Sequence, residues 1–384
     1  MNHIHTDIYC AQRSKHQGSP CGDAFGFFYD IDSTTIILSD GLGSGIKANI
    51  AAEMCVSRFL GLIKNGSSLR DAFSALVKTM NIAWGTNEPF AVFSVARILN
   101  NGFTTVLSYE CPLPILVSEN IATALSDRVY KIDNAIISEN TVTIKIGDGI
   151  LLLSDGITQA GLGHGLPNGW EVEGVAGFIN KKRKPGKLNG QLLVDDIMQQ
   201  ARIYWGKSQG DDCSVLFAKT RKGVIVNILS GPPEDKQLDE NLLNDFMKTR
   251  GIKVICGGTT SQMASRILNK KLEPADYDAS PISPPGYKME GIHLVTEGIV
   301  TLNQAYNLLD EDFDASISEE SAVYELVDLL KTADRCNMFI GKSVNYTESD
   351  LVYKQQGIIS RARILQLIEN KLISKGKLVV KYEY

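Results

Sequence analysis

Two short apolar runs, each ending in Ser-Asp-Gly, constrain the possible fold of this chain more than any other feature. The first is TTIILSDG at 34–41, and the second is GILLLSDG at 149–156. Short apolar runs that end in a turn signal are typical of buried strands. The two runs therefore carry Asp40 and Asp155 to strand ends, where a buried carboxylate must be paired or must coordinate a metal.

The segments around these runs indicate a layered domain. Apolar residues recur at spacings of three and four from 47 to about 62, and a second helix fits 68–84. Further strands are predicted at 90–99, 103–111, 114–118, 141–149 and 213–220, with a helix at 191–205 before the last of them. Strands on both sides of a helical block predict an α+β domain over residues 1–220, not a doubly wound parallel sheet.

From residue 221 the pattern changes to a regular alternation. Strands are predicted at 224–229, 253–258, 291–298 and 377–384, and helices at 239–251, 261–271, 301–310, 320–335 and 357–375. This alternation predicts a smaller α/β domain over residues 221–384. Two domains are also the default expectation for 384 residues.

Composition excludes several classes of protein. A net charge of -5 argues against a nucleic-acid-binding surface over the whole protein, although a local patch stays open. No apolar run reaches the ~18 residues of a membrane span, and the N-terminus lacks the apolar region of a signal peptide. The seven cysteines are scattered, without a CxxC pair. We therefore expect a cytoplasmic protein with reduced thiols and with no membrane or nucleic-acid partner.

Carboxylates stand beside glycine or at strand ends in four places. They are Asp23 in CysGlyAspAlaPhe, Asp40, Asp155, and the pair Asp211 and Asp212 in GlyAspAspCysSer. The neighbouring sequence downstream of Asp40 and Asp155 offers few cations to neutralise them. Oxygen donors without histidine or cysteine suit Mg²⁺ or Mn²⁺ and not zinc. Several carboxylates from separate strands could hold two such ions.

A simpler interpretation exists for each place taken alone. Asp-Gly is among the commonest turn dipeptides, so any single one of these sites would be interpreted as a plain turn. The combination, in this order and with these flanks, favours a metal site.

The same motifs resemble those of a known family. Gly-Asp-x-Phe, then Asp-Gly-Leu-Gly-Ser-Gly before a helix, then LeuLeuLeuSerAspGlyIleThrGln, then GlyAspAspCysSerVal, are similar to the metal-dependent (PPM-type, type 2C) protein phosphatases. The closer resemblance is to the bacterial branch typified by the stage II sporulation protein E phosphatase domain, over residues 5–219. It implies a β-sandwich flanked by helices, with a binuclear Mn²⁺ or Mg²⁺ centre at one end.

The resemblance also implies roles for individual residues. By position, Asp40 would bridge the two metals, and the backbone carbonyl of Gly41 would be a further ligand. Asp155 would bind one metal, and Asp211 would complete the core.

Two further carboxylates receive lesser roles from the resemblance. Asp212 would support the site, and Asp23 would lie near the metals or bind an additional ion. The arginine that many such phosphatases use to hold phosphate has no counterpart at 18–20, and Arg13 lies farther away. Gln159 stands where glutamate is common, and we expect activity to survive that change. The sequence does not identify the group that positions the phosphate.

The implied activity is hydrolysis of phosphoserine or phosphothreonine on a phosphorylated bacterial regulatory protein. Such hydrolysis has a very high uncatalysed barrier. Two divalent ions lower the pKa of water and neutralise phosphoryl charge, so that water attacks phosphorus without a covalent intermediate. A pseudophosphatase that uses the same fold for binding is the alternative, although all the core aspartates are present. A third hypothesis makes the C-terminal domain a ligand sensor.

The third hypothesis rests on CysGlyGlyThrThrSer at 256–261, between a predicted strand and a predicted helix. Backbone N–H groups at a helix N-terminus, with hydroxyls beside them, could bind an anion. The segment is not a Walker A motif, and a strand-to-helix turn with a Ser/Thr cap is the simpler interpretation. We expect the C-terminal domain to be regulatory or substrate-recruiting, without catalytic groups. A small anionic ligand and a homodimer both stay open.

Overall fold

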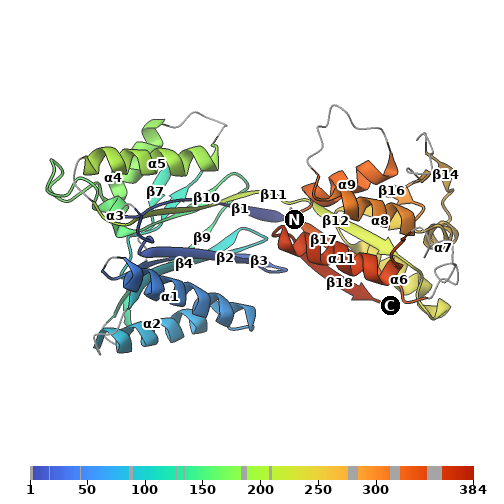
Figure 1. Cartoon of the computed structure of the whole chain (residues 1–384), viewed down its shortest axis with the longest axis horizontal. Coiled ribbons are helices and arrows are strands. Elements are labelled where there is room, and N and C mark those ends of the chain that lie inside the picture. The colour runs from blue at the N-terminus through green and yellow to red at the C-terminus, as the bar shows by residue number, and fades with distance from the viewer. Residues whose placement is uncertain are drawn as a thin grey trace. The chain divides into compact units, whose positions relative to one another are not determined.

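The structure is a computed structural model in which the chain divides into two compact units, Met1–Lys222 and Gly223–Tyr384 (Figure 1). Each unit is described by itself. The described residues are 3–16, 18–43, 45–85, 90–125, 128–132, 135–182, 188–206, 210–275, 284–311, 321–343 and 357–384.

The first unit contains two antiparallel sheets. Its strands are β1 (Ile4–Arg13), β2 (Asp23–Tyr29), β3 (Ser33–Gly41), β4 (Ala91–Leu99), β5 (Phe103–Tyr109), β6 (Ile115–Val117), β7 (Ala122–Ala124), β8 (Arg128–Ile132), β9 (Ala135–Thr143), β10 (Gly149–Leu153) and β11 (Cys213–Lys222). One sheet has the order β1-β11-β10-β6-β7, and the other has the order β2-β3-β4-β5-β9-β8. The two Ser-Asp-Gly runs thus lie in different sheets, as β3 and β10.

The two sheets pack face to face through an aliphatic core. Ile36 and Leu38 of β3 meet Leu152 of β10 and Leu216 of β11 in this layer. Side chains alternate along a strand, so Ile37 points to the opposite face and joins a separate core beneath the helices. A continuous apolar run such as that of β3 is what a strand needs when both of its faces are buried.

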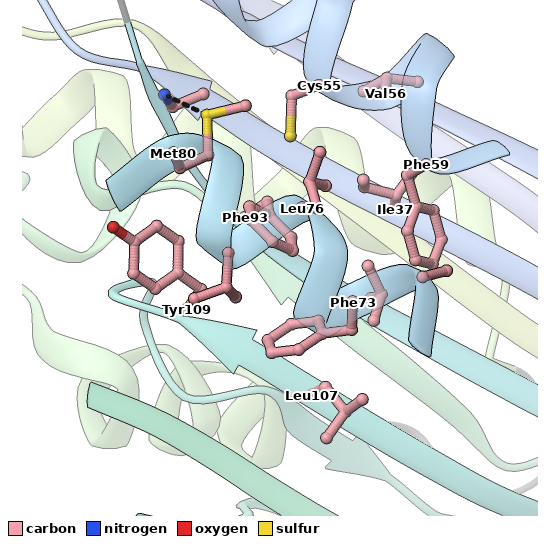
Figure 2. Close-up of a cluster of buried hydrophobic side chains, with 14 of the residues drawn as sticks. Ile37, Cys55, Val56, Phe59, Phe73, Leu76, Met80, Phe93, Leu107 and Tyr109 are labelled. Atoms are coloured by element: carbon pink, nitrogen blue, oxygen red, sulfur yellow. Dashed lines mark hydrogen bonds between the residues drawn. The ribbon is translucent and has the colours of Figure 1, made fainter. Parts of the chain in front are cut away.

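Helices cover both outer faces of the sandwich. The helices are α1 (Ile46–Lys64), α2 (Leu69–Gly85), α3 (Asp155–Thr158), α4 (Glu171–Lys182) and α5 (Gly190–Trp205). Figure 2 shows the core under α1 and α2, in which Cys55 and Phe59 of α1 and Leu76 of α2 are buried with Phe93 of β4. Helices α4 and α5 cover the other sheet. The predicted fold class, an α+β sandwich flanked by helices, is confirmed.

One strand prediction in this unit was wrong in its bounds. The alternating segment at 141–149 is strand only as far as Thr143, at the end of β9. Thr143 pairs with Phe103, the first residue of β5, and a last backbone bond from the Ile144 N–H group to the Gly102 carbonyl at 2.9 Å follows this pair. The chain then turns, with Gly147 at a φ of 98° and the Asp148 carboxylate accepting a hydrogen bond from the Lys145 N–H group.

The second unit is built on a mostly parallel sheet with the strand order β14-β15-β16-β13-β12-β17-β18. Its strands are β12 (Ile225–Ser230), β13 (Ile252–Cys256), β14 (Glu273–Pro274), β15 (Gly286–Met289), β16 (Ile292–Thr296), β17 (Arg335–Ile340) and β18 (Leu378–Glu383). Its helices are α6 (Asp239–Lys248), α7 (Gly258–Leu268), α8 (Ile299–Leu308), α9 (Ala322–Thr332) and α11 (Arg361–Ser374), with a short 3₁₀ turn η1 (Lys236–Leu238).

Five of these strands, β16-β13-β12-β17-β18, run parallel. The chain adds β13 and β16 on one side of β12, and then adds β17 and β18 on the other side. Helices α6 and α7 cover one face, where Leu229 and Ile255 lie, and α8, α9 and α11 cover the other, where Ile228 and Val254 lie. The second unit is therefore an α/β fold, and the strand order reverses between β12 and β17.

None of the described helices combines the length and the apolar composition that a membrane crossing requires. All seven cysteines lie in the described part of the chain, and each is free. Four of them, Cys55, Cys213, Cys256 and Cys336, are buried as ordinary members of the cores.

Candidate active site

The pairing of β2 with β3 places the first two aspartates side by side. Asp23 and Asp40 are direct partners in the antiparallel register. Directly opposed residues have Cβ atoms roughly 5 Å apart on the same face of the sheet. The Gly41 N–H group donates to the Gly22 carbonyl at 3.1 Å, which continues the pairing past the aspartates.

Gly41 allows the chain to turn from β3 into α1. A Cβ atom at this position would lie 2.0 Å from the carbonyl oxygen of Ala48 in α1. Because no side chain fits there, the backbone of Gly41 packs directly against the helix, next to Asp40. The glycine in the first Asp-Gly pair thus has a packing reason of its own, whether or not its carbonyl binds a metal.

A second pair of strands carries the remaining aspartates. The Ser154 N–H group donates to the Ser214 carbonyl at 3.0 Å, and the Ser214 N–H group donates to the Ser154 hydroxyl at 2.8 Å. These bonds join the end of β10 to the start of β11, so that Asp155 and the pair Asp211 and Asp212 lie at one edge of the sheet. This junction requires glycine at position 156, because a Cβ atom there would lie 2.0 Å from the Asp212 carbonyl oxygen.

The aspartates of the two sheets influence one another. Burial raises the pKa of Asp40 well above its usual range, and the charges of Asp23 and Asp155 raise it further. Burial is also the main reason that the pKa of Asp155 is raised, and a hydrogen bond with Asp40 opposes that rise. Asp155 additionally accepts a hydrogen bond from the Gln159 amide at 2.9 Å. The ends of β3 and β10 therefore bring their carboxylates together, although they belong to different sheets.

Asp23 is the most deeply buried of these carboxylates. Its side chain is 2% exposed, and neither oxygen has a hydrogen-bond partner among the described residues. Burial raises the pKa of Asp23, and the nearby hydroxyls of Ser214 and Ser154 oppose that rise. Neither hydroxyl forms a hydrogen bond of normal geometry with the carboxylate. A buried carboxylate without donors is costly, and contact with a cation would remove that cost.

The ligand atoms available at this site are therefore of the type that binds a hard divalent cation. Carboxylates from both sheets lie here, with the Gly41 carbonyl beside Asp40, and oxygen atoms of this kind are the ligands that Mg²⁺ and Mn²⁺ prefer. Among the described residues, however, no three side chains of histidine, cysteine, aspartate or glutamate form a ready-made ligand group. The structure thus shows convergence of the predicted aspartates and does not show individual metal bonds.

The two neighbouring aspartates at the start of β11 differ in their surroundings. Asp212 is 5% exposed, and its carboxylate accepts a hydrogen bond from the Lys15 backbone N–H group at 2.7 Å. The Asp211 side chain is 34% exposed and lies 3.5 Å from the Lys15 ammonium group. Asp211 is therefore accessible, whereas Asp212 holds the backbone that follows β1.

Lys15 is the residue that reasoning from the sequence missed. It lies 196 residues from Asp211 in the sequence. Strand β1 pairs with β11 up to the pair Arg13 and Cys213, and this pairing delivers Lys15 to the aspartates. Arg13 itself lines a small cavity with Asp211 and Arg202. The sequence indicated few cations among the near neighbours of the acidic motifs, and Lys15 lies outside that count because it is distant in the sequence.

Comparisons with known proteins concern the family and the fold. The family model for stage II sporulation protein E (SpoIIE) matches residues 30–221. No curated protein sequence matches the chain.

Among solved structures, the chain is similar to the PP2C phosphatase domain, with a fragment of the regulatory domain, of SpoIIE from Bacillus subtilis. The identity is 16% and the TM-score is 0.50, and the match covers 58% of this chain and 66% of that one. A second crystal form of the Bacillus subtilis phosphatase domain gives 16% identity and a TM-score of 0.44, with coverage of 58% and 95%. RsbX in complex with magnesium gives 18% identity and a TM-score of 0.41, with coverage of 56% and 99%. At 16% identity, the first of these likenesses shows a similar fold and nothing about activity.

Proposed function

Because the chain belongs to the stage II sporulation protein E family, we propose that it is a metal-dependent serine/threonine protein phosphatase with its active site in the first unit. The observation that carries the proposal is the convergence of Asp23, Asp40 and Asp155 from the ends of two separate sheets. The buried oxygens of Asp23, which lack partners among the described residues, support it. The proposed substrate is phosphoserine or phosphothreonine on a bacterial regulatory protein.

We assign two divalent ions, Mn²⁺ or Mg²⁺, to the carboxylates of this site. Asp40 would bridge them, and Asp155, Asp211 and the Gly41 carbonyl would complete the ligands. When bound, the ions supply Lewis-acid activation of water and neutralise the charge of the phosphoryl group. Asp23 would lie beside the ions or hold an additional one.

The neighbouring residues would hold these ligands in place. The Gln159 amide fixes one oxygen of Asp155 through its hydrogen bond. The Asp212 carboxylate anchors the backbone at Lys15, and this supporting role suits a side chain that is almost fully buried. Interactions of this kind typically change metal affinity or activity by about 10–100-fold when they are removed.

Lys15 is our candidate for the group that positions the substrate phosphate. Its ammonium group lies 3.5 Å from an Asp211 carboxylate oxygen, and about a third of the lysine side chain is accessible. An ammonium group beside the ligands can pair with a phosphate oxygen as a charge-assisted contact. It would take the place of the arginine that residues 18–20 do not provide.

The test is hydrolysis of an aryl phosphate, followed by hydrolysis of a phosphoserine peptide. We expect activity with Mn²⁺ or Mg²⁺ and its loss in EDTA. Asp155→Asn and Asp211→Asn should abolish turnover, whereas Asp212→Asn, the matched neighbour, should lose about 10–100-fold. Full activity in chelator would sink the two-metal proposal.

The alternative, a pseudophosphatase or ligand-sensing module, predicts a different result in the same assay. The protein would bind Mn²⁺, measured by metal analysis after desalting, and would hydrolyse neither substrate. For the second unit we propose a regulatory or substrate-recruiting role, without catalytic groups. A cytoplasmic location is part of the same proposal.

A further inference from the structure

The second unit contains a cavity of about 610 Å³ at the carboxyl edge of its parallel sheet. The residues at or just after three strand ends line it: Ser230 of β12, Cys256 of β13 and Glu297 after β16. In doubly wound sheets, ligands bind in the crevice outside the carboxyl ends of the strands, where the strand order reverses. The volume is within the range of sites for small organic ligands.

Helix α7 opens directly onto this cavity. Its N-cap residue, Gly257, has a φ of 133° and contributes no side-chain capping bond, and Gly258 and Thr259 also line the cavity. The first N–H groups of a helix lack partners within the helix, and the helix dipole adds partial positive charge there. The Gly258 N–H group already donates to the Glu297 carbonyl at 2.9 Å, so the N–H groups of Thr259 and Thr260 in the first turn of α7 are the donors suited to an anion.

The neighbouring helix, α8, is arranged differently. The Glu297 carboxylate accepts a hydrogen bond from the Val300 N–H group at 3.3 Å, so this side chain caps α8 itself. The two N-caps come very close, because a Cβ atom on Gly298 would lie 2.8 Å from the Gly257 Cα atom. Neither N-cap glycine provides a side-chain cap, but the Glu297 carboxylate accepts a hydrogen bond from the first turn of α8.

A buried hydroxyl points independently to a ligand. Ser230 is 1% exposed and lines the cavity, and its hydroxyl oxygen has no hydrogen-bond partner among the described residues. It ends β12, at the point where the strand order reverses. An unsatisfied hydroxyl in such a place is costly, and a bound anion would accept its hydrogen bond. The Gly231 N–H group donates to the Thr260 hydroxyl at 3.0 Å, which ties the end of β12 to the first turn of α7.

The remaining walls supply one positive charge and an apolar surface. Arg361 lines the cavity and is held by hydrogen bonds to the carbonyls of Gly341 and Ser343. Leu272 and Tyr287 also line the cavity, and they give it apolar and aromatic surface. The cavity therefore combines an anion-binding end with space for an organic body.

We propose that the second unit binds a mononucleotide. Its phosphate would lie at the N-terminus of α7, between the Ser230 hydroxyl and Arg361, and its base would lie against Tyr287. A lone phosphate would leave most of the cavity unfilled, and a triphosphate has no lysine of the Walker type to meet it. This inference does not depend on the phosphatase proposal, because it concerns a different unit.

The test is calorimetric titration of the full chain with AMP, ADP, ATP, ribose 5-phosphate, adenosine and inorganic phosphate. EDTA is present throughout, so that phosphate binding at the metal centre of the first unit does not contribute. We expect one saturable site for AMP or ADP, bound on the order of tenfold or more tightly than adenosine and phosphate. No saturable binding of any nucleotide up to about 10 mM would overturn the proposal. Equal affinity for inorganic phosphate and AMP would also overturn it.

Gly258 offers a matched pair of variants. A Cβ atom there meets no atom within 4 Å, so both substitutions should fold. Gly258→Ala is the reference for Gly258→Asp, because it introduces the same Cβ atom without the charge. Gly258→Asp places a carboxylate at the start of α7, which suits the helix but repels phosphate, and should weaken binding on the order of a hundredfold. Undiminished binding by a folded Gly258→Asp protein would refute the site. Ser230→Ala should weaken binding on the order of tenfold.

Discussion

The proposed metal centre predicts an unusual consequence for Asp40→Asn. The variant should be more stable than the unchanged protein in chelator and less stable with metal. Asp40 directly opposes Asp23 across β2 and β3, and its pKa is raised by burial and by neighbouring carboxylates. Replacing it with a neutral side chain of the same shape relieves that repulsion, and it also removes the proposed bridging ligand.

The size of the effect follows from the pairing. Two unit charges about 5 Å apart at an effective dielectric constant near 20 repel by about 3 kcal/mol. Because the raised pKa of Asp40 keeps part of the population protonated, we expect a gain in the free energy of unfolding of about 1–2 kcal/mol in EDTA. With Mn²⁺ at a hundred times its dissociation constant, binding would stabilise the unchanged protein by about 2.7 kcal/mol, and the variant would lose most of this.

The pH dependence has a definite sign. An aspartate whose folded pKa is raised binds more protons in the folded state, so stability in chelator falls as pH rises above the unfolded value of about 3.9. The advantage of Asp40→Asn in EDTA should therefore grow from acid toward neutral and higher pH.

Tryptophan fluorescence during urea unfolding is the assay. All three tryptophans, Trp84, Trp170 and Trp205, belong to the first unit, so the signal reports on that unit. Glu53→Gln on the exposed face of α1 is the control, and we expect it to change neither transition. Our reasoning would be refuted if Asp40→Asn were less stable than the unchanged protein in EDTA at every pH, or if Mn²⁺ stabilised both proteins equally.

Three further predictions follow from the packing and from the site. Lys15→Met should raise the KM for an aryl phosphate on the order of tenfold with the same Mn²⁺ requirement, and an unchanged KM would remove Lys15 from phosphate binding. Gly41→Ala should lower the free energy of unfolding in urea by about 3 kcal/mol or more, because the new methyl group would collide with α1. Gly61→Ala inside that helix should raise the free energy of unfolding by up to about 1 kcal/mol. Equal effects of the two substitutions would contradict the assigned contact. A fragment ending at Lys222 should keep the fluorescence transition and Mn²⁺-dependent hydrolysis. A folded, metal-loaded fragment without activity would show that the second unit contributes to the site.

Local patterns predicted most of the elements. The apolar runs became β3 and β10, and the spacing of three and four from 47 to 62 became α1 at Ile46–Lys64. These patterns succeed because the spacing of apolar residues within ten to twenty neighbouring positions indicates which faces of an element are buried. Most of the strand–helix alternation after residue 221 was predicted for the same reason.

Where burial is not apolar, local patterns failed. Strand β17 was missed, and one of its central residues is Asn337, which donates a hydrogen bond to Asn227 of β12 at 2.8 Å. Both side chains are buried, so the polar pair satisfies itself inside the sheet. The buried Asn337 interrupts the apolar run of this short strand, whereas the longer run around Asn227 was still predicted as a strand.

The amino-acid sequence by itself determined where the turns and carboxylates fall along the chain, because strand runs and Ser-Asp-Gly endings are properties of adjacent residues. Only the tertiary structure decided which of these ends meet. Asp40 and Asp155 belong to different sheets, and Lys15 reaches Asp211 through the pairing of the first strand of the unit with its last. The cavity of the second unit likewise depends on a strand order that no local pattern contains. Such contacts arise from packing between segments far apart in the chain, and their energies depend on burial and charge that exist only after the chain has folded.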